Sequence, residues 1–258
     1  MDLNHRRLGT GSPLLLLHGI GMRWQWWTPV LDALAERHEV WAIDFAGFGD
    51  SPPLPDGAPR NPAAHADTIE AFARTHGIER PAVAGISMGG WVALELAKRG
   101  AVTAAVPCSP AGFWEGWEGT YSRVSLVATS RLARAVAPFA DTLTATAAGR
   151  IALFSQIAVH PARIPASEAA ASLRAVAASD FDRTLAAMAP ERFSGGDAVS
   201  VPVTVAWGKQ DRLLLTRRQA PRAEREVRGA KLVLMPGCGH VATYDDPGLM
   251  ARTILGSV

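Results

Sequence analysis

The stretch Gly85-Ile86-Ser87-Met88-Gly89-Gly90 carries the strongest structural signal in this chain of 258 residues. It follows a short apolar run at residues 81–84 that favours a β-strand, and it precedes a run at residues 91–98 that favours an α-helix. The glycines on either side of Ser87 leave room for a sharp reversal between the strand and the helix. The stretch therefore predicts a tight turn that presents the Ser87 hydroxyl at the edge of a sheet.

The pattern G-x-S-x-G needs support from the rest of the sequence, because glycine and serine are common in loops. The same residues could form an ordinary glycine-rich turn in which Ser87 only caps the following helix. A serine nucleophile also needs a general base and a third group that orients the base. The two interpretations are therefore separated by what lies elsewhere in the chain.

Composition and charge exclude several classes of protein. The chain is 48% hydrophobic and 19% charged, which fits one sizeable domain or a domain with a large insertion. A formal net charge of +2 gives no electrostatic reason to expect nucleic acid or a membrane surface as a partner. The apolar run after Arg6-Arg7 is too short for a signal peptide, and no stretch approaches the roughly 20 apolar residues that span a bilayer. We expect a cytoplasmic, soluble protein, and the sequence leaves its oligomeric state open.

Cysteine and histidine positions predict no bound group. The two cysteines, Cys108 and Cys238, do not suggest a disulfide framework. No group of cysteines and histidines has the spacing of metal ligands. We therefore expect neither a metal nor an organic cofactor.

Short apolar runs alternate with longer helical runs along most of the chain. The runs that favour strands lie at residues 14–17, 39–43, 81–84, 103–108, 201–207 and 231–235. The runs that favour helices lie at residues 26–37, 61–76, 89–98, 217–226 and 247–255. Most of the strand runs are continuously apolar, which is typical of strands buried on both faces. The pattern predicts an α/β fold with a mostly parallel central sheet flanked by helices.

One long interval interrupts this alternation. From about residue 113 to residue 197 the sequence favours helices, at residues 121–139, 142–159 and 167–188, and no strand. We therefore predict a core formed by residues 1–112 and 198–258, with residues 113–197 inserted as a helical cap, or lid.

An aspartate and a histidine follow Ser87 in the order that a Ser-Asp-His triad on this type of sheet requires. Asp211 comes just after the expected strand at residues 201–207, and His240 comes just after the one at residues 231–235. Either residue alone is more often a surface or capping residue. Their joint placement favours Ser87, Asp211 and His240 as the catalytic residues.

A glycine-rich loop, His18-Gly19-Ile20-Gly21, follows the first apolar run. An oxyanion hole needs two backbone N–H groups aimed at the developing negative charge. We expect these donors to be the amides of Ile20 and Met88. We expect the imidazole of His18 to brace the loop.

With these motifs the chain resembles a compact bacterial serine esterase of the α/β-hydrolase fold with a helical cap. The segment of residues 44–51, D-F-A-G-F-G-D-S, resembles the D-x-x-G-x-G-x-S turn of that family, which is mainly structural. Two features differ from the family pattern. Only 13 residues precede Leu14, so the opening hairpin must be shortened or partly missing, and the segment around Ser109 offers no carboxylate, which favours Asp211 as the acid.

The resemblance implies hydrolysis of a carboxylic ester, or a related acyl bond, through an acyl-enzyme. Epoxide hydrolases and haloalkane dehalogenases of this fold carry an aspartate at the position of Ser87, so both activities are disfavoured. The alternatives are a C–C bond hydrolase, a thioesterase, a lactonase or a cofactor-free perhydrolase on the same triad. A catalytically silent binding module of the same fold is a further alternative.

Aromatic residues suggest the character of the binding site. Trp24 and Trp27 lie just after the glycine-rich loop, and Phe113 and Trp114 lie at the start of the predicted cap. If the cap closes over Ser87, these residues line an apolar pocket for a small-molecule ester or acyl substrate with an apolar group. Alternatively, the rings only join the cap to the core. The sequence does not specify the acyl chain length or the leaving group.

Overall fold

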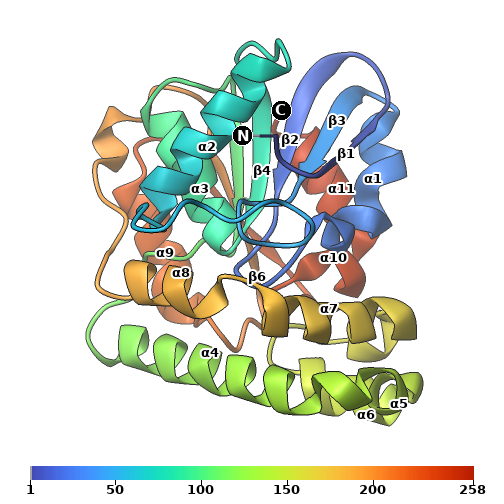
Figure 1. Cartoon of the computed structure of the whole chain (residues 1–258). Coiled ribbons are helices and arrows are strands. Elements are labelled where there is room, and N and C mark those ends of the chain that lie inside the picture. The colour runs from blue at the N-terminus through green and yellow to red at the C-terminus, as the bar shows by residue number, and fades with distance from the viewer. Residues whose placement is uncertain (1) are drawn as a thin grey trace.

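A seven-stranded sheet runs through the computed structural model, which describes residues 2–258 (Figure 1). The strands lie in the order β1-β3-β2-β4-β5-β6-β7. Their bounds are β1 His5–Leu8, β2 Ser12–Leu17, β3 His38–Ile43, β4 Ala82–Ile86, β5 Ala105–Cys108, β6 Thr204–Gly208 and β7 Lys231–Met235. β1 is antiparallel to β3, and every other pairing in the order is parallel. The predicted α/β-hydrolase fold, with a mostly parallel sheet flanked by helices, is confirmed.

Helices cover both faces of the sheet. On one face lie α2 (Pro62–Thr75), α3 (Met88–Lys98) and α9 (Thr216–Glu226), and on the other lie α1 (Thr28–Ala35) and α11 (Pro247–Leu255) (Figure 1). Two short helices, η1 (Trp24–Trp27) and α10 (Ala242–Asp245), lie in the connections. Burial on both faces explains why the strand sequences are continuously apolar.

The strand β2 shows this two-sided burial. Leu14 and Leu16 contribute to the apolar core on the α1 side, and Leu15 and Leu17 contribute to the core on the α3 side. Successive side chains of a strand point to opposite faces, so an uninterrupted leucine run fills both cores at once. This run secures β2 at the middle of the sheet.

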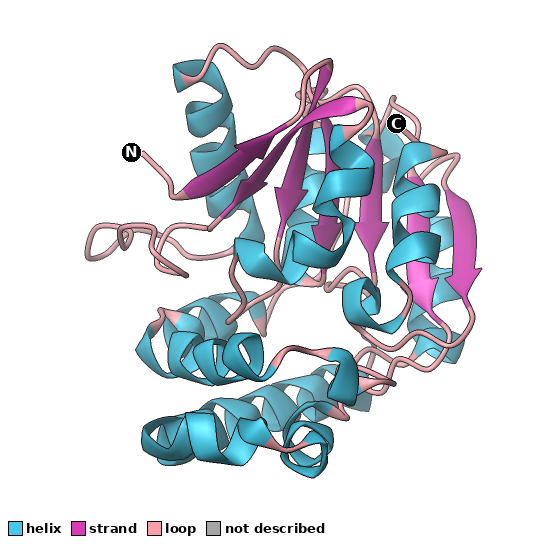
Figure 2. Ribbon diagram, turned by 90° about the vertical axis from the view of Figure 1, so that its right-hand side faces the viewer, coloured by secondary structure: helices cyan, strands magenta, loops and turns pink. Residues whose placement is uncertain are grey.

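The chain between β5 and β6 folds into helices below the carboxyl ends of the parallel strands (Figure 2). We call this the α4–α8 layer. Its helices are α4 (Trp117–Val136), η2 (Ala137–Phe139), α5 (Ala140–Ala145), α6 (Ala147–Phe154), η3 (Pro161–Arg163), α7 (Ala166–Ala178) and α8 (Phe181–Met188), followed by η4 (Gly196–Ala198). No helix among residues 2–258 combines the length and the apolar composition needed to cross a bilayer.

Two of the predicted helices in this layer are broken. The predicted helix at residues 142–159 is divided into α5 and α6 at Thr146, whose extended backbone and hydroxyl cap the new helix by accepting from the Gly149 amide at 3.1 Å. The predicted helix at residues 167–188 ends at Ser179, because the next amide, that of Asp180, donates to the Gly47 carbonyl at 3.0 Å. This second break is set by a tertiary contact that helical periodicity does not encode.

The chain opens with an edge strand that the sequence did not predict. β1 pairs with β3 along its whole length, from His5 opposite Ile43 to Leu8 opposite Val40. Arg6 and Arg7 interrupt the apolar run by which the other strands were predicted. The guanidinium of Arg7 lies 4.7 Å from the ring of Trp41 on β3, which is how a polar edge residue covers apolar surface. β1 is therefore a strand of the sheet that apolar patterning does not reveal.

The turn at Ser87 is the sharpest feature of the fold. Ser87 adopts φ +56° and ψ −113°, a conformation that few non-glycine residues accept. A Cβ atom on Gly85 would lie 2.1 Å from the Gly89 carbonyl oxygen, and one on Gly89 would lie 2.3 Å from the Leu17 carbonyl oxygen. Both glycines are therefore required by close backbone contacts, and they let α3 begin directly against β2 and β4.

The substitution Gly89→Ala is expected to lower the free energy of unfolding by about 3 kcal/mol or more, because its methyl group would meet backbone that cannot move aside. Urea denaturation followed by circular dichroism measures the loss. The matched control is Gly77→Ala, where φ is +66° but no atom lies within 4 Å, and we expect it to cost about 1 kcal/mol. Equal losses in the two variants would contradict the close-contact argument.

Candidate active site

Loops at the carboxyl ends of β4, β6 and β7 carry Ser87, Asp211 and His240 respectively. The three parallel strands belong to one sheet, so their carboxyl ends meet at one edge. This is the edge that the α4–α8 layer faces (Figure 2). The fold therefore brings to one place three residues that are 124 and 29 positions apart in the chain.

The side chains of His240 and Asp211 are joined by a buried hydrogen bond. The distance from His240 Nδ1 to Asp211 Oδ2 is 2.8 Å, and both side chains are almost fully buried. The other carboxylate oxygen of Asp211 accepts from the amides of Leu213 at 2.8 Å and Leu214 at 2.9 Å. A carboxylate oxygen accepts hydrogen bonds, so Nδ1 is the donor in this contact, and Nε2 is the ring nitrogen that Asp211 does not contact.

Ser87 and His240 line the same cavity. Among the described residues the Ser87 hydroxyl makes no hydrogen bond with the His240 ring; such bonds are often long in an enzyme without its substrate and tighten when the substrate binds. The backbone of Ser87 is firmly held: its amide donates to the Cys108 carbonyl at 2.9 Å, and its carbonyl accepts from Ala111 at 3.0 Å. The Ser87 side chain is thus free to rotate, while the Ser87 backbone is fixed by these hydrogen bonds.

Two backbone amides near Ser87 have no acceptor among the described residues. Met88 is the first residue of α3, where an N–H has no partner inside the helix. The amide of Ile20, in the glycine-rich loop after β2, makes no hydrogen bond to any part of the chain that the structure describes. Ile20 and Ser87 line the same cavities. These are the two amides that the sequence predicts as oxyanion donors.

The loop that carries Ile20 is braced by His18. The Nδ1 atom of His18 donates to the Gly19 carbonyl at 2.7 Å, and its Nε2 atom accepts from the Phe45 amide at 3.0 Å. Burial lowers the pKa of His18, while the nearby charge of Asp44 opposes this shift. The ring is therefore neutral and occupied at both nitrogens, as expected of a structural residue.

Asp44 fixes the neighbouring turn. Its carboxylate accepts from the Trp24 amide at 2.6 Å, the Asn4 side chain at 2.6 Å and the Asp50 amide at 3.1 Å. The Ser51 hydroxyl donates to the Asp44 carbonyl at 2.7 Å. These bonds tie the segment of residues 44–51 to the loop after β2, which gives that segment a structural role beside the site.

Two small cavities meet at Ser87. The larger has a volume of about 90 Å³ and is lined mainly by apolar side chains from the loop after β2 and from the α4–α8 layer: Ile20, Met22, Trp26, Leu126, Ala133, Leu153, Phe154, Ile157, Leu173, Val176, Phe181 and Leu213, with the polar residues Thr129, Gln156 and Ser172. The smaller has a volume of about 30 Å³ and also contacts Trp114, Ser122, Arg123, Leu185 and Met188. Both lie well below the roughly 300–1,000 Å³ of common ligand pockets.

The structure separates the four aromatic residues predicted to contact substrate. Trp114 lines the smaller cavity, whereas Trp24, Trp27 and Phe113 line neither of the two. Trp27 and Phe113 are fully buried in the apolar core. Trp26 lines the larger cavity instead, because residues 24–27 form a 3₁₀ turn that directs successive rings to different sides. Sequence spacing alone could not tell which tryptophan of the cluster faces Ser87.

Asp245 fastens the loop of His240 to the α4–α8 layer, a role that no sequence pattern indicates. Its buried carboxylate accepts from the amides of Gly239 at 2.8 Å, Val159 at 2.9 Å and His160 at 2.7 Å. One carboxylate thus holds the residue before His240 and two residues that follow α6. A movement of Val159 and His160 would therefore shift the loop that carries His240.

Among residues 2–258, one group of potential metal ligands is found, and it lies outside this site. Asp2, His5 and His76 each offer one ligand atom, and these atoms lie within 4.8 Å of one another. The three residues line neither of the cavities that contain Ser87. At Ser87 the structure provides a hydroxyl, an imidazole and backbone amides.

Residues 14–253 match the model of the alpha/beta hydrolase family, and the chain belongs to this family. The chain is 29% identical over 252 residues to the dihydrolipoyllysine-residue acetyltransferase component of the acetoin cleaving system of Cupriavidus necator. That match covers 93% of this chain but only 62% of the relative, so the chain spans less than two thirds of that protein's length.

Solved structures of the same fold superpose on almost the whole chain. A thermophilic esterase from Thermogutta terrifontis has a TM-score of 0.74 at 22% identity, over 98% of this chain and 92% of the esterase. A meta-cleavage product hydrolase from Pseudomonas fluorescens has a TM-score of 0.76 at 18% identity, over 98% of this chain and 93% of the hydrolase. At such identities the likeness concerns the fold.

His65 provides a test of the packing beside the His18 loop. Both of its ring nitrogens are buried without a hydrogen-bond partner among the described residues, and its ring packs 5.1 Å from that of Phe45. Burial, assisted by the charge of Arg60, lowers the pKa of His65 to about 4, well below the ordinary value of 6.5. The unfolded chain therefore binds a proton between pH 6.5 and 4 that the folded protein does not bind. As the pH is lowered across this window, the free energy of unfolding decreases by up to about 3 kcal/mol.

We expect His65→Leu to remove most of this loss, so that its free energy of unfolding depends less on pH between 6.5 and 4 than that of the unchanged protein. Urea titrations at pH 7 and pH 4.5 measure the difference. The exposed His160, changed to Gln, serves as the control and should retain the full acid dependence. An identical pH dependence in His65→Leu would show that His65 is not buried as a neutral ring.

The substitution Asp245→Asn is expected to lower the free energy of unfolding by about 2–3 kcal/mol, because an amide NH₂ would then face backbone N–H groups that now have an acceptor. Chemical denaturation measures this loss. Asp246→Asn is the matched neighbour: Asp246 only caps α11 through the Leu249 amide, and asparagine caps equally well. A neutral effect of Asp245→Asn would mean that the loop of His240 is held by other contacts.

Proposed function

We propose that this protein is a serine hydrolase that cleaves a carboxylic ester, or a related acyl bond, through an acyl-enzyme. The observation that carries the proposal is the hydrogen bond of 2.8 Å between His240 Nδ1 and Asp211 in a cavity wall that also contains Ser87. It leaves the basic Nε2 atom of His240 as the free nitrogen beside a serine on a strained turn. Ser87, His240 and Asp211 then act as nucleophile, general base and orienting acid.

In the proposed reaction the Ser87 oxygen attacks the acyl carbonyl while His240 Nε2 takes the hydroxyl proton. Asp211 keeps the imidazole in the required tautomer and stabilises the imidazolium that forms. His240 then gives the proton to the leaving group as the bond between the acyl carbon and the leaving group breaks. Water, deprotonated by the same histidine, attacks the acyl-enzyme and releases the acid and Ser87.

The amides of Ile20 and Met88 are the proposed oxyanion hole. Both lack an acceptor among the described residues, and both belong to loops whose positions are fixed, by His18 in one case and by the start of α3 in the other. Donors that are already oriented stabilise the negative charge of the tetrahedral intermediate without reorganising. Removing one such donor typically lowers turnover by about 10²–10³.

Residues 113–197 are the proposed cap, over a core formed by residues 1–112 and 198–258. Several polar contacts hold them in place. Arg23 pairs with Glu168 at 2.6 Å, Arg60 pairs with Asp180 at 3.0 Å, and the Asp180 amide donates to Gly47. The cavities beside Ser87 lie between core and cap residues. A cap in this position would exclude water from the reacting bond and strengthen the electrostatic contacts.

The apolar lining and the small size of the cavities favour an apolar acyl group of modest size. The C–C bond hydrolase, thioesterase, lactonase and perhydrolase alternatives use the same triad, so only turnover separates them from an esterase. A catalytically silent binding module would have no need of the oriented His240–Asp211 pair.

Ser87 is expected to react with a fluorophosphonate, giving one mass adduct on the intact protein. Ser87→Ala should abolish the adduct and lower the turnover of a p-nitrophenyl ester by about 10⁴–10⁶, because the nucleophile is lost. Ser172→Ala is the matched control: it also removes a serine hydroxyl from the same cavity and should keep the label. No adduct on the folded protein, or an equal adduct on Ser87→Ala, would refute the nucleophile.

A series of p-nitrophenyl esters of increasing chain length, run beside a C–C bond substrate, identifies the bond that is cleaved. Rapid turnover of short esters with no cleavage of the C–C substrate supports the esterase. Cleavage of the C–C substrate alone would contradict the esterase and show that Ser87, His240 and Asp211 catalyse C–C bond hydrolysis.

A further inference from the structure

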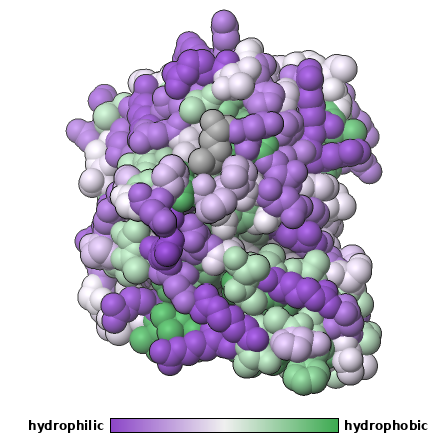
Figure 3. Space-filling view, viewed as in Figure 1, coloured by the Kyte–Doolittle hydropathy of each residue, from purple (hydrophilic) through white to green (hydrophobic). Residues whose placement is uncertain are grey.

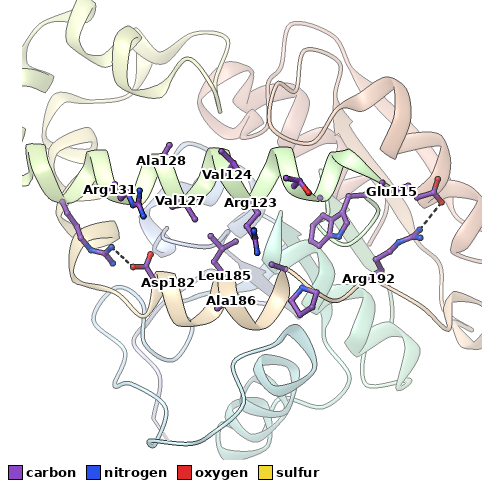
Figure 4. A pocket seen from close by; sticks show the side chains of 17 residues that line it. Glu115, Arg123, Val124, Val127, Ala128, Arg131, Asp182, Leu185, Ala186 and Arg192 are labelled. Atoms are coloured by element: carbon purple, nitrogen blue, oxygen red, sulfur yellow. Dashed lines mark hydrogen bonds and ion pairs between the residues drawn. The ribbon is translucent and has the colours of Figure 1, made fainter.

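A broad groove lies between α4 and α8 on the outer side of the α4–α8 layer, with a volume of about 1,400 Å³ (Figure 4). Its apolar lining, which we call the apolar floor, includes Val124, Val127 and Leu185. In the space-filling view this layer, at the bottom, carries hydrophobic and hydrophilic residues side by side (Figure 3). The groove is therefore neither a purely apolar patch nor an ordinary charged surface.

Positive charge predominates in the groove. Four arginines line it, Arg123, Arg131, Arg134 and Arg192, against two acidic residues, Asp182 and Glu115. The acidic residues are already occupied, because Asp182 pairs with Arg134 at 2.6 Å and Glu115 pairs with Arg192 at 3.3 Å (Figure 4).

Arg123 and Arg131 provide the excess positive charge of the groove. Neither forms an ion pair or a side-chain hydrogen bond with the part of the chain that the structure describes, residues 2–258. In the close view both extend from α4 into the space between α4 and α8 (Figure 4). A guanidinium without a carboxylate partner, directed into a groove, is suited to bind an anionic group with two parallel hydrogen bonds.

The groove adjoins the smaller cavity at Ser87. Five residues line both: Trp114, Gly119, Arg123, Leu185 and Ala189. Ser87 and Ile20 also line that cavity. Arg123 is thus the one unpaired cation, among the described residues, whose surroundings include both the groove and the cavity of the proposed nucleophile.

We propose that this groove is the access route for an ester substrate that carries a carboxylate or a phosphate, and that Arg123 is its specificity-determining residue. The inference rests on the proposed hydrolase function of Ser87. The apolar floor accommodates the chain between the anionic group and the ester bond, and Arg131 attracts the anion along the groove. Positive charge at the mouth of a site also raises the rate at which anionic ligands arrive.

The test compares two esters of the same chain length, one with a charged end and one in which a methyl group removes the charge. Mono-4-nitrophenyl adipate carries a free carboxylate, and methyl 4-nitrophenyl adipate is its neutral counterpart. We expect kcat/KM of the unchanged protein to favour the anionic ester by about tenfold or more, and the preference to shrink in 0.5 M NaCl, because salt screens exposed charges. A phosphate-ended ester, 4-nitrophenyl 6-phosphonooxyhexanoate, and an ester with the carboxylate on the alcohol side, 4-carboxyphenyl butyrate, then show which anion and which side of the bond the groove takes.

Arg123→Gln should reduce the preference to about twofold or less, mainly through a higher KM for the anionic ester, and Arg123→Lys should restore part of it. Arg131→Gln should reduce it to a smaller extent. Arg174→Gln is the matched control, because Arg174 is an exposed arginine of the same layer that pairs with Asp141 and lines neither the groove nor the cavities. It should leave the preference unchanged.

The outcomes separate the two proposals. Turnover of neutral esters without any preference for an anionic ester, or a preference that survives Arg123→Gln, overturns the role of the groove and leaves the hydrolase in place. Absence of all turnover overturns the hydrolase. Calorimetric titration of Ser87→Ala with both adipate esters gives a second measurement that does not need turnover: tighter binding of the anionic ester, lost on adding Arg123→Gln, supports the groove, and equal binding refutes it.

Discussion

The close backbone contact at Gly85 and Gly89 is the constraint on which the rest of the site depends. Without side chains at these positions, Gly85 on β4 lies against the Gly89 carbonyl of α3, and Gly89 lies against the Leu17 carbonyl of β2. That approach forces Ser87 into its left-handed conformation and leaves the Met88 amide without a helical partner. One geometric requirement thus positions both a hydroxyl and a candidate oxyanion donor, which is why a six-residue pattern is so informative.

A second constraint links the α4–α8 layer to the loop of His240. Asp245 accepts hydrogen bonds from both, and the Val241 amide donates to the Ile157 carbonyl at 2.8 Å. The loop that carries the His240 imidazole is therefore bonded to the α4–α8 layer both directly, through Val241, and through the carboxylate of Asp245. A layer that opened as a rigid lid would have to break these buried bonds, so the end near α6 is the anchored one. The groove between α4 and α8 is edged instead by exposed ion pairs, which are weak contacts.

The sequence predicted the elements whose pattern is local. The β7 strand and α11 begin and end at the predicted residues, because a continuous apolar run and the cap at Asp246 are local sequence signals. The same holds for the order of Ser87, Asp211 and His240. It failed where distant contacts decide: the break before α8 follows from a bond to Gly47, and β1 is held by pairing with β3 in spite of its polar sequence. The choice of Trp26 over Trp27 at the cavity depends on a 3₁₀ turn that periodicity does not reveal.

The two sides of the site make opposite demands on a substrate. The cavities at Ser87 are small and largely apolar, so burying a charge there without a partner would cost several kcal/mol or more. The groove outside is broad and has unpaired guanidinium groups. A molecule that satisfies both must be apolar at the reacting bond and charged at a distance from it. The α4–α8 layer supplies the separation, since α4 contributes Leu126 to both cavities and Arg123 to the junction between the smaller cavity and the groove. Residues three apart on a helix lie on neighbouring parts of its surface, so a single helix can present an apolar wall to the ester and a cation to its charged end.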